Sequence, residues 1–517
     1  MNKSSKYYES CYFGREKMAR KKIAMLCLST AIFCFSFFST GSAQTKKYKS
    51  TWESLSQHEK APEWFKDAKF GIYFHWGVYS VPAFGSEWYP RNMHLPDRKE
   101  YKHHLKTYGH PSRFGYHDFV PLFKAEHFDS EEWADLFQEA GARFAGPVAE
   151  HHDGFSMWAS HVNPWNVKDK GPKRDITGEL AKSFKKRRIK LITTFHHARL
   201  LQRNVGLEDW NGPDSYDSHY PYHPDYPTSS KDPELRLLYG NIPDDQFYKQ
   251  WKKKIIEVID NYHPDIIWFD SWLNLIPENI RQELCAYYLN SALKRDKNVV
   301  ITYKQVDLPK SFCVLDIEKG VALDRTDETW VTDDTLSWGS WCYTQDIKIK
   351  PAKIVLHSLI DIVSKNGVLL LNISPKADGS IPDNQKKVLR TIGKWLKKYG
   401  EAIYNTQAWY VYGFGPTKSS EKTTTVFSSK DVRFTWSRDG KIIYIIFLGK
   451  PEQGKKVELR SFGIHRYPTP SPIKRITLLG TDIQVEWELN DYSFYLTIPD
   501  GPKNDMATVF KMELKGE

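Results

Sequence analysis

The chain has 517 residues, of which 40% are hydrophobic and 15% aromatic, so it can bury a large core and still present aromatic faces to a ligand such as a sugar. Its formal net charge of +11 includes seven Lys/Arg and two Glu in the first 43 residues, a net of +5. No basic run of the kind that binds phosphates stands out in the rest, so composition and charge argue against nucleic-acid binding.

The N-terminal segment is typical of an export signal. Basic residues at 20–22 precede an uncharged apolar run at 23–38, and Gly41 and Ala43 place small residues at positions −3 and −1 of a cleavage site. The run is shorter than the roughly 20 residues that a membrane-spanning helix needs. We therefore expect residues 1–43 to be a signal peptide with an upstream extension. The mature protein is then periplasmic or extracellular, without a membrane span.

Short apolar runs alternate with amphipathic segments between residues 50 and 404. Runs that are apolar throughout are typical of strands buried on both faces, and their alternation with helices over this length indicates a (β/α)₈ barrel of the TIM type. Seven strands are predicted at 69–76, 143–150, 189–197, 264–270, 298–303, 312–318 and 367–374, and an eighth near 339–344. Helices are predicted at 131–142, 176–188, 247–262, 352–366 and 383–400.

Two regions depart from this alternation. A polar segment at 199–245 follows the third strand, and a loop of that length is usually functional or disordered. Residues 405–517 contain further strand patterns separated by Gly, Pro and Asp, with RDGK at 438–441 predicting a hairpin. We expect them to form a separate all-β domain. Its predicted strands lie at 432–437, 441–449, 474–480 and 494–499.

Most of the predicted barrel strands end in a polar or ionisable residue. Active sites of (β/α)₈ barrels lie at the C-terminal ends of the strands, and five such endings in one chain are hard to explain by chance. We therefore expect the active site to be built from these strand ends. The residues are His75, Glu150 followed by His151 and His152, His196 followed by His197, Asp270, and Glu318.

Asp270 and Glu318 are the candidate catalytic carboxylates. Asp270 ends the run IIWFD between Trp268 and Trp272, so apolar walls surround a carboxylate that can face a developing oxocarbenium ion. The alternative for Asp270 is an Asp that caps a following helix. Glu318 ends VLDIE, and its alternative is a salt-bridged residue at the barrel rim. Two carboxylates about 5–5.5 Å apart are what a retaining glycosidase requires.

Histidines and aromatic residues near two strand ends are candidate ligand-binding residues. His151 and His152 lie in EHHDGF; adjacent residues of a strand point in opposite directions, but at a strand end both can reach one pocket. Imidazole offers sugar hydroxyls both a donor and an acceptor, so sugar binding, a structural role and metal binding all stay open for this pair. FHWG and EWY add His75, Glu87 and Trp88.

Four separated motifs together resemble glycoside hydrolase family 29, the α-L-fucosidases, over roughly residues 50–480. The resemblance implies a barrel with a C-terminal β-sandwich, a retaining double-displacement mechanism, a fucosylated oligosaccharide or glycoconjugate as substrate, and neither metal nor other cofactor. The motifs are WFKDAKFGIYFHWGVYSVPAFGSEWY (64–89), EHHDGF (150–155), PDIIWFD (264–270), and GVLLLNISPKADGSIPDNQ (367–385) with KWLKKYGEAIYNT (394–406).

The resemblance also implies roles for individual residues. Asp270 stands at the nucleophile position of the family. Glu318 is preferred as the acid and base because it ends a strand, and the acidic residues near it that were also considered are Asp316, Asp327, Glu328 and Asp333. The positions implied to bind the hydroxyls, ring and methyl group of fucose are His75, Glu87, Trp88, His151, His152 and Trp268.

The chain departs from the family pattern at several positions. Ser271 follows the nucleophile where Gly is more usual, and Cys342 stands where Gly is frequent. The third strand ends in FHHA (195–198), where Tyr is common in some members, and Lys304 stands where other members have Arg, which loses a bidentate fork. None of these changes removes the nucleophile. The third-strand change and the segment 199–245 leave the linkage preference open.

Two alternative functions use the same residues. The first is hydrolysis of a related sugar such as an α-L-galactoside, which needs a pocket that accepts a hydroxyl at C6. The second is a catalytically silent carbohydrate-binding protein, for which the loss of a catalytic carboxylate would be the sign. Both candidate carboxylates are present, so retaining, exo-acting α-L-fucosidase is the expected activity. The oligomeric state is not predicted.

Overall fold

The computed structural model describes residues 47–203, 218–420, 424–459, 462, 472–501 and 503–515. The signal peptide expected at residues 1–43 lies outside this part of the chain. None of the helices within it is long and apolar enough to cross a membrane.

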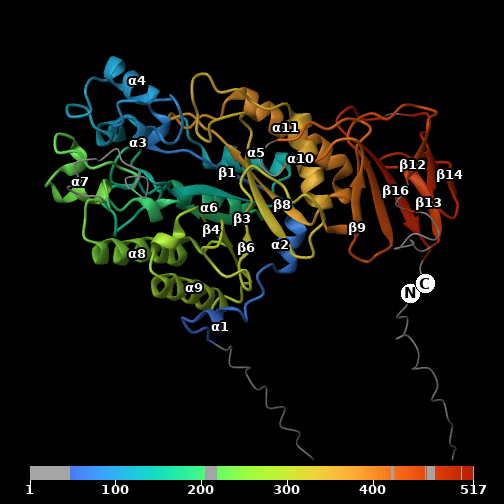
Figure 1. Ribbon diagram of the computed structural model, residues 1–517, viewed down its shortest axis with the longest axis horizontal. Coiled ribbons are helices and arrows are strands. Elements are labelled where there is room, and N and C mark those ends of the chain that lie inside the picture. Colours follow the sequence, from blue (N-terminus) through green and yellow to red (C-terminus); the bar gives the residue numbers. More distant parts are fainter. Residues whose placement is uncertain are drawn as a thin grey trace, which may run out of the picture. The chain divides into compact units, whose positions relative to one another are not determined.

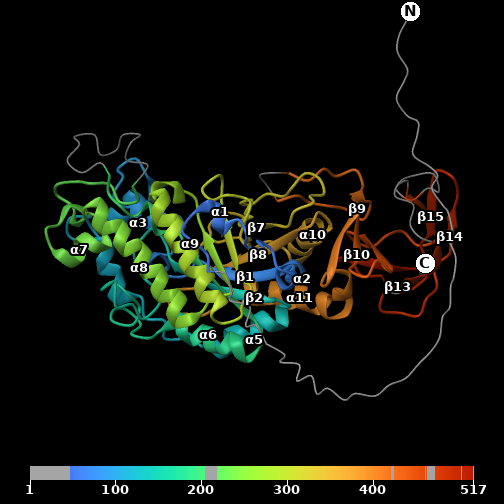
Figure 2. The same cartoon turned by 90° about the horizontal axis from the view of Figure 1, so that it is seen from below.

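Eight parallel strands form a barrel, as predicted, with helices on both sides of the strands (Figure 1, Figure 2). The strand order is β6-β5-β4-β3-β2-β1-β8-β7. The strands are β1 (Phe70–Phe74), β2 (Phe144–Glu150), β3 (Lys190–Phe195), β4 (Ile266–Phe269), β5 (Val300–Tyr303), β6 (Val314–Leu315), β7 (Trp330–Thr335) and β8 (Gly367–Ile373).

The barrel closes between β6 and β7 through few contacts. A single isolated bridge pairs Asp316 with Val331 in parallel. The backbone N–H of Ile317 donates to Val331 O at 2.9 Å, and that of Asp333 donates to the Asp316 carboxylate at 2.9 Å. The two strand ends that border this seam carry several of the acidic residues singled out above.

The longer helices surround the strands: α5 packs beside α6, α6 beside α8, α8 beside α9, and α11 beside both α10 and α5. α5 shows the local causes: the Asp129 carboxylate accepts hydrogen bonds from the backbone N–H groups of Glu131 and Glu132 in the first turn, and Gly141 ends the helix with φ of 91°. The longer helices are α5 (Ser130–Ala140), α6 (Ile176–Lys186), α8 (Asp244–Tyr262), α9 (Glu278–Leu293), α10 (Ala352–Ser364) and α11 (Asp383–Tyr399). The shorter ones are α1 (Trp52–Leu55), α2 (Glu63–Ala68), α3 (Tyr89–Asn92), α4 (Lys99–Thr107) and α7 (Pro233–Leu238).

The predicted position of one barrel strand is wrong. The strand expected near 339–344 is instead β7, at Trp330–Thr335, and residues 339–344 form bends. The segment WVTDDT lacks an apolar run because Asp333 is buried at the mouth of the barrel, where it accepts a hydrogen bond from Tyr73. A functional side chain inside the strand therefore hid the strand from the hydrophobic pattern. Helix α9 was also not predicted, because its buried residues spread around much of its surface.

The C-terminal strands form two antiparallel sheets that share one core. Side chains from both sheets, including Trp409, Phe434, Phe494 and Phe510, pack in this core. The hairpin predicted at 438–441 joins β10 and β11, with Gly440 at φ of 71°. One sheet has the order β13-β16-β11-β10-β9 and the other β12-β15-β14. Their bounds are β9 (Thr406–Phe414), β10 (Val432–Ser437), β11 (Ile442–Phe447), β12 (Lys456–Leu459), β13 (Ile473–Leu478), β14 (Trp487–Leu489), β15 (Phe494–Thr497) and β16 (Thr508–Leu514).

Buried charges join the barrel to these sheets. Asp361 on α10 accepts hydrogen bonds from Arg433 of β10 at 2.5 Å, Lys365 at 2.9 Å and Ser419 at 3.0 Å. The three charged side chains are at most 2% exposed. We call these four residues the junction cluster.

Candidate active site

A cavity of about 150 Å³ opens at the C-terminal ends of the barrel strands. Seven of the eight residues predicted to be catalytic or sugar-binding line it, Asp270 and Glu318 among them, and only Trp268 does not. The lining residues are His75, Glu87, Trp88, His151, His152, His196, Asp270, Ser271, Trp272, Lys304, Glu318, Asp333 and Trp341.

The seven residues that share this one cavity are both predicted carboxylates and every predicted sugar-binding residue except Trp268.

A larger cavity, of about 730 Å³, lies at the other end of the barrel between α5, α6 and α11. Its ionisable lining is almost entirely basic, with Glu139 as the one carboxylate among the described residues that line it. It therefore lacks the pair of carboxylates that glycoside hydrolysis uses. The smaller cavity is the candidate active site because it holds the chemistry, although it holds less volume.

Asp270 follows β4 and is held by three cationic or hydrogen-bonding side chains. Its Oδ1 lies 3.1 Å from Lys304 Nζ, and its Oδ2 lies 3.1 Å from His196 Nδ1 and 3.3 Å from His152 Nε2. Burial alone would raise the pKa of Asp270, but Lys304, His196 and His152 outweigh burial and hold that pKa well below its ordinary value. Asp270 is therefore an ionised carboxylate at neutral pH, as a nucleophile must be.

Glu318 stands across Lys304 from Asp270. Its Oε2 lies 2.9 Å from Lys304 Nζ, so this oxygen and Asp270 Oδ1 are at most about 6 Å apart, which is compatible with the separation of about 5–5.5 Å in retaining glycosidases. The Glu318 side chain is 46% exposed, whereas that of Asp270 is 13% exposed. One carboxylate thus lies inside the cavity and the other at its mouth.

Lys304 follows β5 and connects the acidic residues of the cavity. Its ammonium group contacts Asp270, Glu318 and, at 3.3 Å, Asp333. Burial would lower the pKa of Lys304, but these carboxylates raise it well above its ordinary value, so the charge is retained. We call Lys304 with its three carboxylates the site cluster.

The other acidic residues considered near Glu318 have different environments. Asp327 and Glu328 are exposed and pair with Arg325 and Lys60. Asp316 is buried, its carboxylate accepts the Asp333 backbone N–H, and burial together with Asp333 raises its pKa well above the ordinary value. Asp333 lines the cavity but is 1% exposed.

An irregularity at the end of β2 explains how the adjacent residues His151 and His152 both reach the cavity. The register of β2 against β3 shifts between Val148 and Glu150, and such a bulge redirects the side chains that follow. His151 and His152 both line the cavity. Glu150 points elsewhere and pairs with Lys254 at 2.5 Å, so this strand-end carboxylate has a structural partner.

The remaining predicted residues, His75, Glu87 and Trp268, differ in their position relative to the cavity. His75 Nδ1 lies 2.8 Å from Asn372 Oδ1, and Glu87 accepts the backbone N–H of Trp341 at 3.2 Å. Burial raises the pKa of Glu87. Trp268 is fully buried behind the cavity, with its ring 5.0 Å from that of His196 and 4.8 Å from Lys304 Nζ.

His196, expected from its strand end to lie in the active site, lines the cavity although no sugar-binding role was predicted for it. Lys304 was not predicted as a site residue, although it follows a strand and the strand-end rule that found Asp270 could have found it. Two residues of the long segment at 199–245 lie behind the cavity: the Arg199 guanidinium is 4.8 Å from the Trp88 ring and 4.4 Å from the Trp272 ring, and the His219 ring is 5.4 Å from that of His152. No pattern in the sequence indicated these contacts.

Comparisons with known proteins agree with this geometry. The profile of the family described as Alpha-L-fucosidase matches residues 36–401. The chain is 30% identical to the human tissue α-L-fucosidase over 487 residues, covering 91% of this chain and 92% of that protein. It is 32% identical to the human plasma α-L-fucosidase over 422 residues, covering 79% and 80%.

Solved structures show the same relationship. The crystal structure of the Thermotoga maritima α-fucosidase in complex with fucose superposes with a TM-score of 0.70 at 28% identity, covering 90% of this chain and all of that one. A profile match over most of the barrel, relatives of similar length and a shared architecture all indicate the same family. The chain therefore belongs to the α-L-fucosidase family of glycoside hydrolases.

Proposed function

We propose that Asp270 is the nucleophile and Glu318 the general acid and base of an exo-acting α-L-fucosidase that removes terminal α-linked L-fucose from glycans. The observation that carries this assignment is that one ammonium group, Lys304, contacts both carboxylates while Asp270 is held ionised. The family's activity supplies the substrate class.

In the first step, Asp270 attacks the anomeric carbon and protonated Glu318 gives its proton to the departing glycosidic oxygen. The bond from the anomeric carbon to that oxygen breaks, and a β-fucosyl ester of Asp270 forms. In the second step, ionised Glu318 takes a proton from water, the water oxygen attacks the anomeric carbon, and Asp270 leaves as a carboxylate. L-Fucose is released with its α configuration retained.

The exposure of the two carboxylates matches these tasks. The leaving group and the incoming water both approach from solvent, where Glu318 lies, and the covalent ester forms inside the cavity at Asp270. His75, Glu87, Trp88, His151 and His152 surround the space that the sugar would occupy and offer donors, acceptors and an aromatic face to it.

The products formed with azide test the two roles. Purified residues 44–517 are assayed with 4-nitrophenyl α-L-fucoside beside Asp270→Ala, Glu318→Ala and Asp327→Ala, the last an exposed acidic residue that does not line the cavity and serves as a control. Azide should turn Asp270→Ala into a producer of β-fucosyl azide and Glu318→Ala into a producer of α-fucosyl azide. Wild-type activity in either carboxylate variant, or the opposite stereochemistry, would contradict the assignment.

The same assay separates the alternative activities. Faster hydrolysis of the matching α-L-galactoside would favour the related sugar, and binding of fucose without hydrolysis of any fucoside would favour a silent binding protein. Export is part of the proposal because residues 1–43 have the pattern of a signal peptide. Mass spectrometry of the protein from its native cells should then find an N-terminus at residue 44, in the periplasm or the medium.

A further inference from the structure

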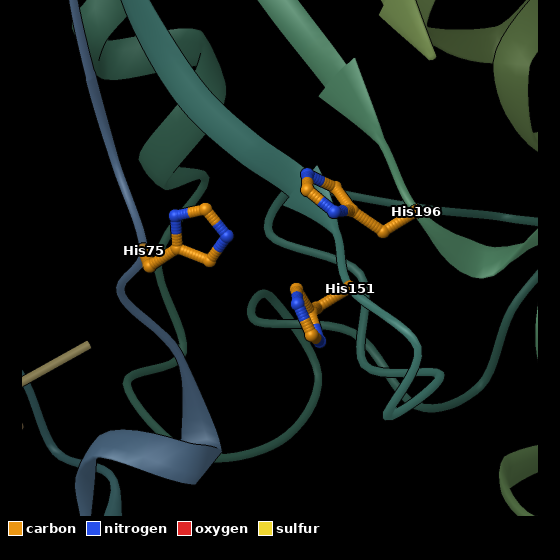
Figure 3. A group of neighbouring side chains, drawn as sticks. All are labelled: His75, His151 and His196. Carbon is orange, nitrogen blue, oxygen red and sulfur yellow. The ribbon is translucent and has the colours of Figure 1, made fainter. Parts of the chain in front are cut away.

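Three histidines converge at the ends of three consecutive strands of the barrel (Figure 3). His75 follows β1, His151 follows β2 and His196 follows β3. One nitrogen of each ring lies within 4.8 Å of a nitrogen of both others, and each residue is at most 4% exposed. We call these residues the histidine trio.

The spacing of the trio suits a tetrahedral metal ion. The ring centroids are 5.4 Å apart for His75 and His151, 5.2 Å for His75 and His196, and 4.8 Å for His151 and His196. Three imidazoles bound to Zn²⁺ through nitrogens about 2.0–2.1 Å from the ion have ring centres about 5 Å apart. Small rotations of the rings are therefore enough to place three nitrogens around one ion.

The hydrogen bonds of the trio leave nitrogens available to an ion. His75 Nδ1 bonds to Asn372 Oδ1 at 2.8 Å, which leaves Nε2 as the acceptor. Nδ1 of His151 has no hydrogen-bond partner within the described part of the chain. His196 Nδ1 lies 3.1 Å from the Asp270 carboxylate, so His196 has the outer carboxylate partner that metal-bound histidines commonly have. Its Nε2 lies 3.2 Å from Thr194 Oγ1, and an ion bound at Nε2 would replace this one hydrogen bond. Burial lowers the pKa of His75 and His151, which keeps both rings neutral.

A second set of three groups competes for the same ion. His152, His196 and Asp270 also lie within 4.8 Å of one another. In that set, however, the ion would bind a carboxylate whose other oxygen already contacts the Lys304 ammonium at 3.1 Å, so two cations would share one carboxylate. The trio includes no carboxylate that Lys304 already contacts, and the carboxylates of the site cluster near it outnumber Lys304. Charge and geometry together favour the trio.

We propose that the histidine trio binds a divalent transition-metal ion of the class that prefers imidazole, such as Zn²⁺, and that the bound ion reversibly blocks the active site. The ion is an inhibitor and takes no part in the two-carboxylate reaction. Binding depends only on the three imidazoles. Inhibition rests on the proposed function, because His75 and His151 are then withdrawn from the sugar.

Direct binding tests the site without reference to activity. Chelator-treated residues 44–517 are titrated with Zn²⁺ by calorimetry, and with Co²⁺ as a probe whose visible absorption reports tetrahedral nitrogen ligands. One equivalent should bind to the wild type. His75→Gln, His151→Gln and His196→Gln should each weaken binding by about tenfold or more, and His152→Gln, the neighbouring control, should leave binding unchanged. Thermal unfolding checks that each variant is folded.

The outcomes are distinct. Absence of stoichiometric binding, or binding that survives in the folded trio variants, overturns the site. Loss of binding in His152→Gln with retention in His75→Gln and His151→Gln moves the ion to the competing set and also overturns it. In kinetics, Zn²⁺ should raise KM without changing kcat, and free L-fucose should displace Co²⁺. Binding at the trio without inhibition overturns the inhibitory role, while the azide products judge the proposed function separately.

Discussion

The site cluster, apart from Glu318 at the cavity mouth, and the junction cluster are both buried groups of Lys, Asp and neighbouring polar residues, but they differ in what is left unpaired. In the junction cluster, Asp361 accepts three hydrogen bonds, and the adjoining cavity measures about 20 Å³. The cavity beside the site cluster measures about 150 Å³ and is lined by polar atoms without partners, including Nδ1 of His151 and Oδ1 of Asp333.

The difference shows what separates a structural ion cluster from a functional one. Burial and charge are common to both, so neither property identifies the site. Buried polar groups are normally hydrogen-bonded, and those that are not are costly unless something else binds them. The unpaired atoms of the site belong to residues that line a cavity, into which a sugar would bring further hydroxyl groups. Substitutions in the two clusters should therefore have opposite effects on activity and stability.

The largest effect is expected at Asp270. Asp270→Asn keeps the size of the side chain but removes the nucleophile, so we expect kcat for 4-nitrophenyl α-L-fucoside to fall by about 10⁴-fold or more. The melting temperature should change little, because Lys304 keeps two other carboxylates. Kinetics and calorimetry on one preparation check both parts. A variant that loses its fold would show that the site cluster is structural after all.

The reverse result is expected in the junction cluster. Asp361→Asn leaves Arg433 and Lys365 buried without their counter-charge, and removing one partner of a buried ion pair costs about 3–5 kcal/mol. Urea unfolding should show this loss, with kcat of the folded protein within about twofold of wild type. Glu401→Gln, which breaks a partly exposed pair with Lys511, is the control and should cost about 1 kcal/mol or less. Equal losses of unfolding free energy in Asp361→Asn and Glu401→Gln would contradict the expectation that a buried ion pair contributes more to stability than a partly exposed one.

Lys304 allows a finer test, because its role in the site cluster is to place a positive charge beside the three carboxylates. Lys304→Met removes the ammonium that lowers the pKa of Asp270, so that pKa should rise and the acid limb of the kcat/KM profile should move to higher pH. We expect kcat/KM at its optimum to fall by about 10²-fold. Lys350→Met is the control, since Lys350 pairs with Asp334 on the same barrel but does not line the cavity. An acid limb that moves equally in both variants would assign the shift to general destabilisation.

The smallest effect is expected from Ser419→Ala. This change removes one neutral hydroxyl from the junction cluster and leaves its charges in place. The free energy of unfolding should fall by about 1 kcal/mol, and kinetic constants should not change. A loss as large as that of Asp361→Asn would mean that the hydroxyl, rather than the ion pairs, holds the cluster together.

The sequence predicted the barrel and the position of Asp270 at its strand end because both depend on local patterns. A strand buried on both faces is a continuous apolar run, and Asp270 interrupts such a run at its end. The same rule failed for β7, since Asp333 and Asp334 stand within the strand and break the run. A hydrophobic pattern cannot identify a strand whose own residues serve the site.

The rest of the site depends on distant parts of the chain meeting in space. Lys304 contacts carboxylates that follow or belong to three other strands, and Arg199 and His219 come from a segment whose sequence indicates only a long loop. Nothing local in KQVDLP or in HYPYHP specifies these partners. The sequence therefore indicates which residues lie at the strand ends, but not which of them contact one another.

Because the barrel closes between β6 and β7, the strands that carry the two proposed catalytic carboxylates are paired to their neighbours to different extents. Asp270 follows β4, which pairs along its length with β3 and β5. Glu318 follows β6, a two-residue strand joined to β7 by one isolated bridge, and the backbone N–H groups of Ile317 and Lys319 beside it donate to Val331 O and Asp333 O of β7. A stiff attachment suits a carboxylate that must bond to one carbon atom. A compliant attachment suits one that serves two successive partners, the departing oxygen and then the entering water, which do not occupy the same point.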